Sequence, residues 1–163
     1  MATTALGGTP VHTVGDLPAQ GSSAPAFTLV GSDFAEVTLQ EGTRTVLNIF
    51  PSVDTPVCAA SVKKFNALAS GLDNARVVCV SADLPFAQAR FCGAQGLDDV
   101  VAASAFRSSF GDDYGVRLVD GGFEGLLARA IVVVDTDGRV IHAELVPEIG
   151  QEPDYDAAVA ALG

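Results

Sequence analysis

Two short β-branched segments, each followed by a helical pattern, constrain the fold of this chain most strongly. Thr45–Phe50 reads TVLNIF and Arg76–Ser81 reads RVVCVS, so each is apolar at most positions. Such runs are typical of central strands that are covered on both faces. Apolar residues between the two runs recur at spacings of three and four, which indicates one face of a helix; they are Cys58, Val62, Phe65, Ala69 and Leu72. Strands separated by a helix need a crossover connection, so part of the sheet is predicted to be parallel.

The remaining elements extend this pattern. A second helix is predicted over Pro85–Gly96, with proline in its first turn and glycine after its last residue. The segments AIVVVD and RVIHAELV flank the turn signal TDG, which favours a β-hairpin. Earlier strands are predicted at Phe27–Val30 and Val37–Leu39, an exposed acidic turn at Phe110–Gly115, and a closing helix in EPDYDAAVAALG. A thioredoxin-like α/β sandwich has this order of elements, as do other α/β folds.

Composition and charge narrow the class of protein. The 163 residues, 48% of them hydrophobic, suit one domain spanning 1–163. A net charge of −11 with nine Lys and Arg argues against binding nucleic acid or an anionic membrane surface. No apolar run approaches the roughly 18 residues of a membrane span, and the first residues lack a secretory signal pattern. Three cysteines in such a chain predict a reducing, cytoplasmic location.

Cys58 stands at the predicted start of a helix. Thr55 is a favourable N-cap and Pro56 suits the first helical position, which makes Cys58 the third helical residue. Unpaired N–H groups and the positive end of the helix dipole favour a thiolate there, and a thiolate is a nucleophile. The alternative is a small residue that fills the core. The residues alone leave both interpretations open.

The other cysteines and one arginine have competing interpretations. Cys79 lies within a predicted buried strand, where apolar burial predicts a structural, unreactive thiol. Cys92, late in the second helix, is either a packed small residue or a redox partner. Arg129 interrupts the apolar segment GLLARAIVVV, either as a strand-entry residue with its charge in water or as a guanidinium directed at an anion. The two histidines, His12 and His142, are far apart in sequence, so no metal site is predicted, and no cofactor is predicted.

The stretch PSVDTPVC contains Pro51, Thr55 and Cys58 in the P-x-x-x-T-x-x-C pattern of peroxiredoxins. Longer blocks resemble the bacterial thiol peroxidases, which are atypical two-cysteine peroxiredoxins. These blocks are LNIFPSVDTPVCAASV, SADLPFAQARFCGA, FGDDYGV, GLLARAIVVVD and ELVPEI…EPDYDAA. The resemblance runs from about Gly8 to Leu162 and includes every catalytic position of the family.

The resemblance implies a thioredoxin-like fold, with an N-terminal β-hairpin in about the first 20 residues, and a set of site residues. Cys58 would be the peroxidatic cysteine, which a hydroperoxide oxidises to a sulfenic acid. Thr55 would hydrogen bond the peroxide oxygens, and Arg129 would stabilise both thiolate and peroxide. Pro51 would shield the sulfenate from water. Cys92 would be the resolving cysteine, which forms a disulfide with Cys58 in the same chain.

The resemblance also implies partners. Thioredoxin, which receives electrons from NADPH through thioredoxin reductase, would reduce the disulfide. The chain would act as an antioxidant enzyme and form homodimers. Because a disulfide needs Cα atoms within roughly 7 Å, the turn around Cys58, the Cys92 segment or both are expected to unwind during turnover. Two alternatives remain: a redox sensor or relay that uses the same cysteine pair to oxidise a partner protein, and a non-catalytic binding module.

Overall fold

The computed structural model describes residues 1–163 as nine strands and four helices. The strands are β1 (Thr3–Leu6), β2 (Thr9–His12), β3 (Thr28–Gly31), β4 (Glu36–Thr38), β5 (Arg44–Ile49), β6 (Ala75–Ser81), β7 (Val101–Ser104), β8 (Ala130–Val134) and β9 (Val140–Leu145). The helices are α1 (Pro56–Ala69), α2 (Pro85–Gln95), α3 (Phe110–Asp113) and α4 (Tyr155–Ala160). No helix combines the length and the apolar character that a membrane crossing requires.

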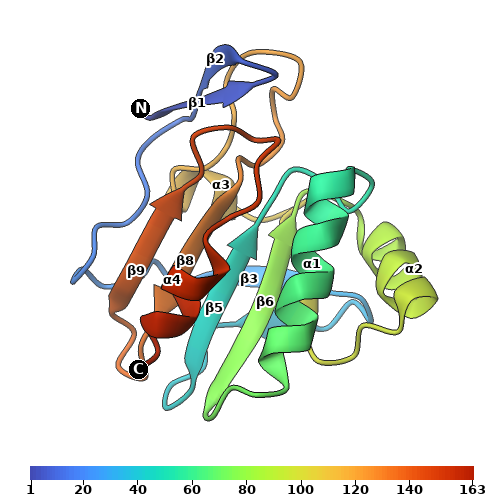
Figure 1. The fold of residues 1–163 in the computed structure, drawn as a ribbon, viewed down its shortest axis with the longest axis vertical. Helices are drawn as coiled ribbons and strands as arrows, with labels where there is room; N and C mark the ends of the chain where they lie inside the picture. The colour runs from blue at the N-terminus through green and yellow to red at the C-terminus, as the bar shows by residue number, and fades with distance from the viewer.

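A seven-stranded mixed sheet forms the centre of the molecule (Figure 1), in the order β4-β3-β7-β6-β5-β8-β9. The predicted parallel part is confirmed, because β6 pairs in parallel with both β5 and β7. On its other side β5 pairs antiparallel with β8, which continues into β9 through the predicted hairpin. The fold is therefore the thioredoxin-like α/β arrangement predicted from the sequence.

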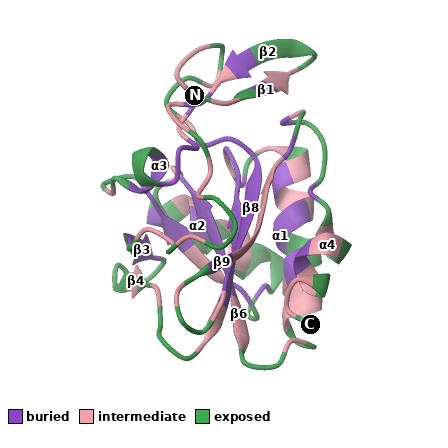
Figure 2. Ribbon diagram, turned by 90° about the vertical axis from the view of Figure 1, so that its left-hand side faces the viewer, coloured by how far each residue is buried: buried purple, intermediate pink, exposed green.

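The central strands bury both of their faces, as their composition predicts (Figure 2). Val46 and Val77 pack in the core cluster that includes residues of α1 and α4, whereas their chain neighbours Leu47 and Val78 pack in the cluster that includes α3. Side chains alternate between the two faces of a strand, so one apolar run supplies both cores. Figure 1 shows α1 and α4 in front of the sheet and α3 behind it.

The predicted N-terminal hairpin is present as the antiparallel pair β1–β2. It lies beyond one end of the main sheet (Figure 2). Val11 of β2 packs in a small cluster with Leu118, Ala128 and Ile149, and Thr4 donates a hydrogen bond of 2.8 Å to the carbonyl oxygen of Val146. The hairpin is thereby held against the loops that surround the start of β8.

The sequence analysis missed β7 and misjudged α3. The segment VAAS of β7 has little intrinsic strand preference, and its strand conformation comes from pairing with β3 and β6 on either side. Phe110–Asp113 forms a short helix rather than an exposed turn, because Phe110 is fully buried. Tyr114 follows it and stacks on Phe110 in the core.

Candidate active site

Cys58 lies where the local sequence places it, at the third position of α1. The helix begins at Pro56, and Thr55 occupies the N-cap position with an extended backbone. The predicted side-chain cap is wrong, however. The Thr55 hydroxyl makes no hydrogen bond to the helix and instead donates to the carbonyl oxygen of Ser52 at 3.1 Å. That bond closes the turn that leads into the helix and leaves the hydroxyl at the edge of the site.

Arg129 settles one of the open alternatives, because its guanidinium is buried rather than in water. The side chain is 1% exposed, and its Nη2 donates to the Cys58 Sγ at 3.1 Å. Its Nε donates to the carbonyl oxygen of Ile149 at 2.7 Å, while Nη1 has no partner in the protein. Strand pairing brings Arg129 close to Cys58. Ala130 of β8 lies opposite Ile49 of β5, so Arg129, the residue before β8, lies near the end of β5, where the loop leading to Cys58 begins.

The charge of Arg129 has an unusual setting. The guanidinium forms no ion pair with any carboxylate. An isolated charge is costly to bury, and it is normally paired with an opposite charge. Among the hydrogen-bond partners of Arg129, only the Cys58 sulfur can carry a negative charge. The Cys58 sulfur is thus the only potential counter-charge that the guanidinium contacts.

A small apolar pocket of about 160 Å³ is lined by Arg129 of this pair and, among others, by Leu6, Thr55, Phe123 and Ile149. Thr55 and Arg129 are its polar lining groups with side-chain donors. The sequence analysis missed the three apolar residues, which come from the N-terminal hairpin and two loops. Isolated apolar residues in such segments carry no periodic signal, so only their assembly in the fold shows that they line one pocket.

Pro51 is buried at the end of β5, directly before the loop that carries Thr55. Cys92 lies apart from this group, on α2. It is half-buried rather than fully packed, and burial together with the nearby negative charge of Asp98 raises the pKa of its thiol. Cys58 and Cys92 are both free thiols in this structure. The structure therefore brings Thr55, Cys58 and Arg129 together and leaves Cys92 on a neighbouring helix.

Cys79 has the environment that the sequence predicted. It is 1% exposed on β6, and burial raises the pKa of its thiol to about 12. Asn48 Nδ2 approaches its Sγ at 3.7 Å. A thiol that stays protonated is a poor nucleophile, so this environment suits a structural residue.

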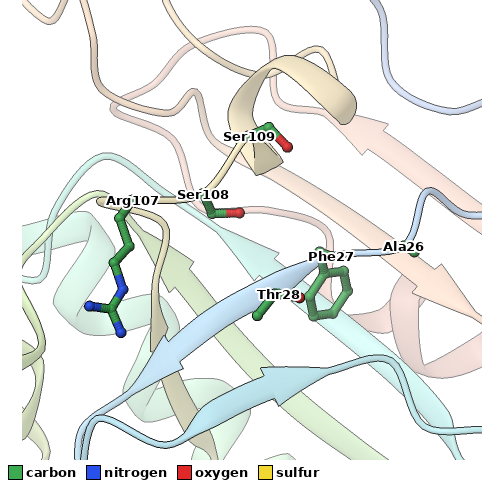
Figure 3. Close-up of a pocket in the computed structure, with 6 residues that line it drawn as sticks. All are labelled: Ala26, Phe27, Thr28, Arg107, Ser108 and Ser109. Carbon is green, nitrogen blue, oxygen red and sulfur yellow. The ribbon is translucent and has the colours of Figure 1, made fainter.

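A larger pocket of about 360 Å³ lies elsewhere and holds none of the predicted site residues (Figure 3). Its walls come from Ala26–Thr28 at the start of β3 and from Arg107–Ser109 before α3. The smaller pocket is the candidate active site, because its lining includes Arg129, whose guanidinium contacts the Cys58 sulfur.

Comparison with known proteins identifies the family of this chain. The redoxin family model matches residues 19–159. Thiol peroxidases of Mycobacterium tuberculosis and Mycobacterium bovis are 60% identical over 167 residues, which cover 100% of this chain and 99% of each relative. A peroxiredoxin-like protein from Aquifex aeolicus superposes with a TM-score of 0.95 at 40% identity, covering 99% of this chain and 96% of its own.

A thiol peroxidase from Chromobacterium violaceum, at 22% identity, shares the fold with a TM-score of 0.90 and covers 98% of this chain and 94% of its own. The chain belongs to the redoxin family, and within it to the peroxiredoxins. Its activity is that of a thiol peroxidase, as the sequence resemblance predicted.

Proposed function

We propose that this chain reduces hydrogen peroxide and organic hydroperoxides through Cys58 and is recycled by thioredoxin. The observation that carries the proposal is the buried contact of 3.1 Å between Arg129 Nη2 and Cys58 Sγ, in which the guanidinium has no carboxylate partner. A cation held in this way stabilises the thiolate, which is the form of cysteine that attacks a peroxide. A non-catalytic binding module would have no need for this contact between Arg129 and Cys58, so the contact favours the peroxidase.

In the first step the Cys58 thiolate attacks one peroxide oxygen. The S–O bond forms as the O–O bond breaks, and the other oxygen leaves as an alcohol or water after taking up a proton; Cys58 becomes a sulfenic acid. The unpartnered Nη1 of Arg129 is a donor available to the peroxide oxygens. The Thr55 hydroxyl donates to the Ser52 carbonyl oxygen and can accept a hydrogen bond from the peroxide O–H. Negative charge moves from sulfur to oxygen in this step, and fixed donors stabilise it most where it develops. Buried Pro51 shields the sulfenic acid from water.

In the second step the Cys92 thiolate attacks the sulfenic sulfur of Cys58. The S–S bond forms as the S–O bond breaks, and the hydroxide leaves as water after taking up a proton. The cysteines occupy two different helices, so the turn around Cys58, the Cys92 segment or both unwind before the sulfurs meet. The dithiol of thioredoxin then reduces the disulfide, with electrons from NADPH through thioredoxin reductase.

The pocket supports hydroperoxides that carry an apolar group. Its lining by Leu6, Phe123 and Ile149 offers apolar contact to the organic part of a substrate, while Thr55 and Arg129 bind the peroxide oxygens. The enzyme acts in antioxidant defence in the cytoplasm as a homodimer of single-domain chains (1–163), each with the hairpin of about residues 1–20 as an extension. The sequence resemblance supports these assignments.

Intact mass and peptide mapping after one equivalent of peroxide test the cysteine roles. Wild type should lose two hydrogens and yield a Cys58–Cys92 crosslink, whereas Cys92→Ser should trap a sulfenic acid on Cys58. Cys79→Ser is the matched control and should behave as wild type. Oxidation spread over all three cysteines would contradict the proposal. Sustained turnover with thioredoxin separates the peroxidase from a redox sensor, which would be oxidised once and recycle poorly.

A further inference from the structure

Asp83 lies in the short segment between β6 and α2. Hydrogen bonds join it to residues 52–55, the loop that leads into Cys58 and is called the peroxidatic loop below. Its Oδ1 accepts from the Ser52 hydroxyl at 2.7 Å, and its Oδ2 accepts from the backbone N–H of Val53 at 2.9 Å. Oδ2 also accepts from the hydroxyl of Ser81 at 2.6 Å. No cation pairs with this carboxylate. Its charge is stabilised entirely by donors, two of which belong to the loop just before Thr55.

These bonds continue to the residue that touches substrate in the proposed reaction. The Ser52 hydroxyl accepts from the N–H of Asp54 at 3.1 Å, and the Ser52 carbonyl oxygen accepts from the Thr55 hydroxyl at 3.1 Å. Asp83 therefore orients Ser52, and Ser52 orients Thr55. Without that support the Thr55 hydroxyl would have more freedom relative to the Cys58 sulfur.

The same network reaches α2, the helix that carries Cys92. Gln88, about one turn before Cys92, is 1% exposed, and its Nε2 donates to the Ser81 hydroxyl at 3.0 Å. Ser81 in turn donates to Asp83. A second link between the two elements, the ion pair of Arg90 with Asp54 at 2.9 Å, is exposed on both sides, and such pairs contribute little.

We propose that Asp83 is a positioning residue that couples the peroxidatic loop to the resolving helix. In the conformation of this structure, with the peroxidatic loop folded, Asp83 places Thr55 for reaction with peroxide. In this proposal the opening segment includes residues 52–53, so their hydrogen bonds to Asp83 break before the disulfide forms, and Asp83 also opposes that step. This inference rests on the proposed two-step reaction, and it assigns to one carboxylate opposite effects on the two steps.

Asp83→Asn tests the proposal, because the amide keeps the size of the side chain but lacks the charge and one acceptor. Hydrogen bonds to a charged group are strong enough that we expect oxidation of Cys58 by peroxide to slow about tenfold. Conversion of the sulfenic acid to the disulfide should accelerate about three- to tenfold, since opening the loop breaks weaker bonds. A residue with a merely structural role would not move the two rate constants in opposite directions.

Rapid chemical quench with mass detection measures both steps, and it suits a chain without tryptophan. Ser52→Ala removes the donor to Oδ1 and should repeat the pattern, and the double variant should add little to either single one. Asp73→Asn, an exposed carboxylate before β6, is the matched control and should leave both constants unchanged.

Equal slowing of both steps, or no change in either, in both Asp83→Asn and Ser52→Ala overturns the inference. The wild-type traces distinguish this failure from failure of the proposed function. If wild type forms no Cys58 sulfenic acid, or if Cys92→Ser still forms the second product, the reaction scheme itself is wrong. If wild type follows the scheme and the variants do not diverge, only the role of Asp83 is wrong.

Discussion

The buried pair of Arg129 and Cys58 leads to a quantitative prediction about stability. For unit charges at the observed 3.1 Å and an effective dielectric constant of about 20, the Coulomb attraction is about 5 kcal/mol. Removing both groups from water opposes much of this attraction. A net coupling of about 1.5–3 kcal/mol remains, which is typical of a hydrogen bond to a charged group.

A double-mutant cycle isolates this coupling. Cys58→Ser replaces the anion with a neutral hydroxyl and leaves a buried cation without a counter-charge, so it should lower the free energy of unfolding by about 3 kcal/mol. Arg129→Met removes the cation and keeps an apolar side chain of similar length, so its cost should be smaller. The double variant should recover most of the loss caused by Cys58→Ser. Peroxidase activity should still fall about 10- to 100-fold in Arg129→Met.

Urea denaturation near neutral pH under reducing conditions measures the cycle. Cys79→Ser combined with Arg129→Met is the matched control, because Cys79 is also buried but is not a hydrogen-bond partner of Arg129. The control cycle should be additive within about 0.5 kcal/mol. If the Cys58 cycle is equally additive, Cys58 is not the counter-charge of Arg129 and the argument for a thiolate fails.

Three further predictions concern other parts of the molecule. Burial and, to a lesser extent, the negative charge of Asp98 raise the pKa of Cys92, so Asp98→Asn should lower this pKa and move the pH profile of disulfide formation toward lower pH. An unmoved profile in quench experiments would contradict this. The pKa of Cys79 is raised to about 12 in the folded protein, which therefore holds this proton more tightly than the unfolded chain. The resulting stability is complete below the unfolded thiol pKa of about 8.5 and is lost as pH rises toward about 12, so Cys79→Ala should show a shallower fall in melting temperature over that window. Gly115 has a φ of +68°, and a Cβ there would lie 2.2 Å from a backbone oxygen, so Gly115→Ala should lower the free energy of unfolding by more than about 3 kcal/mol. Gly138 has a φ of +82° but open space around it, so Gly138→Ala should lower it by about 1 kcal/mol in the same thermal denaturation series.

The sequence by itself determined the elements whose signals are local. The runs at Thr45–Phe50 and Arg76–Ser81 became central strands, since their apolar residues suit burial on both faces. Proline at the first helical position located the start of α1, and with it Cys58, to the residue. The apolar spacing did not locate the end of the helix, because α1 ends at Ala69 instead of reaching Leu72. Burial pattern and helix-start preference act over a few neighbouring positions, so both can be read without knowledge of the fold.

Only the tertiary structure decided which distant residues meet. Arg129 reaches Cys58 because β8 pairs antiparallel with β5. The two residues are 71 positions apart, and no local sequence pattern indicates that these two strands are neighbours. Asp83 binds the peroxidatic loop for the same kind of reason, since parallel β5 and β6 end at one edge of the sheet. At Thr55 the local prediction was wrong: its hydroxyl was expected to cap α1 but instead donates to the Ser52 carbonyl oxygen. Hydrogen bonds between separate segments depend on how strands are ordered and registered, and the whole chain determines that order through its packing.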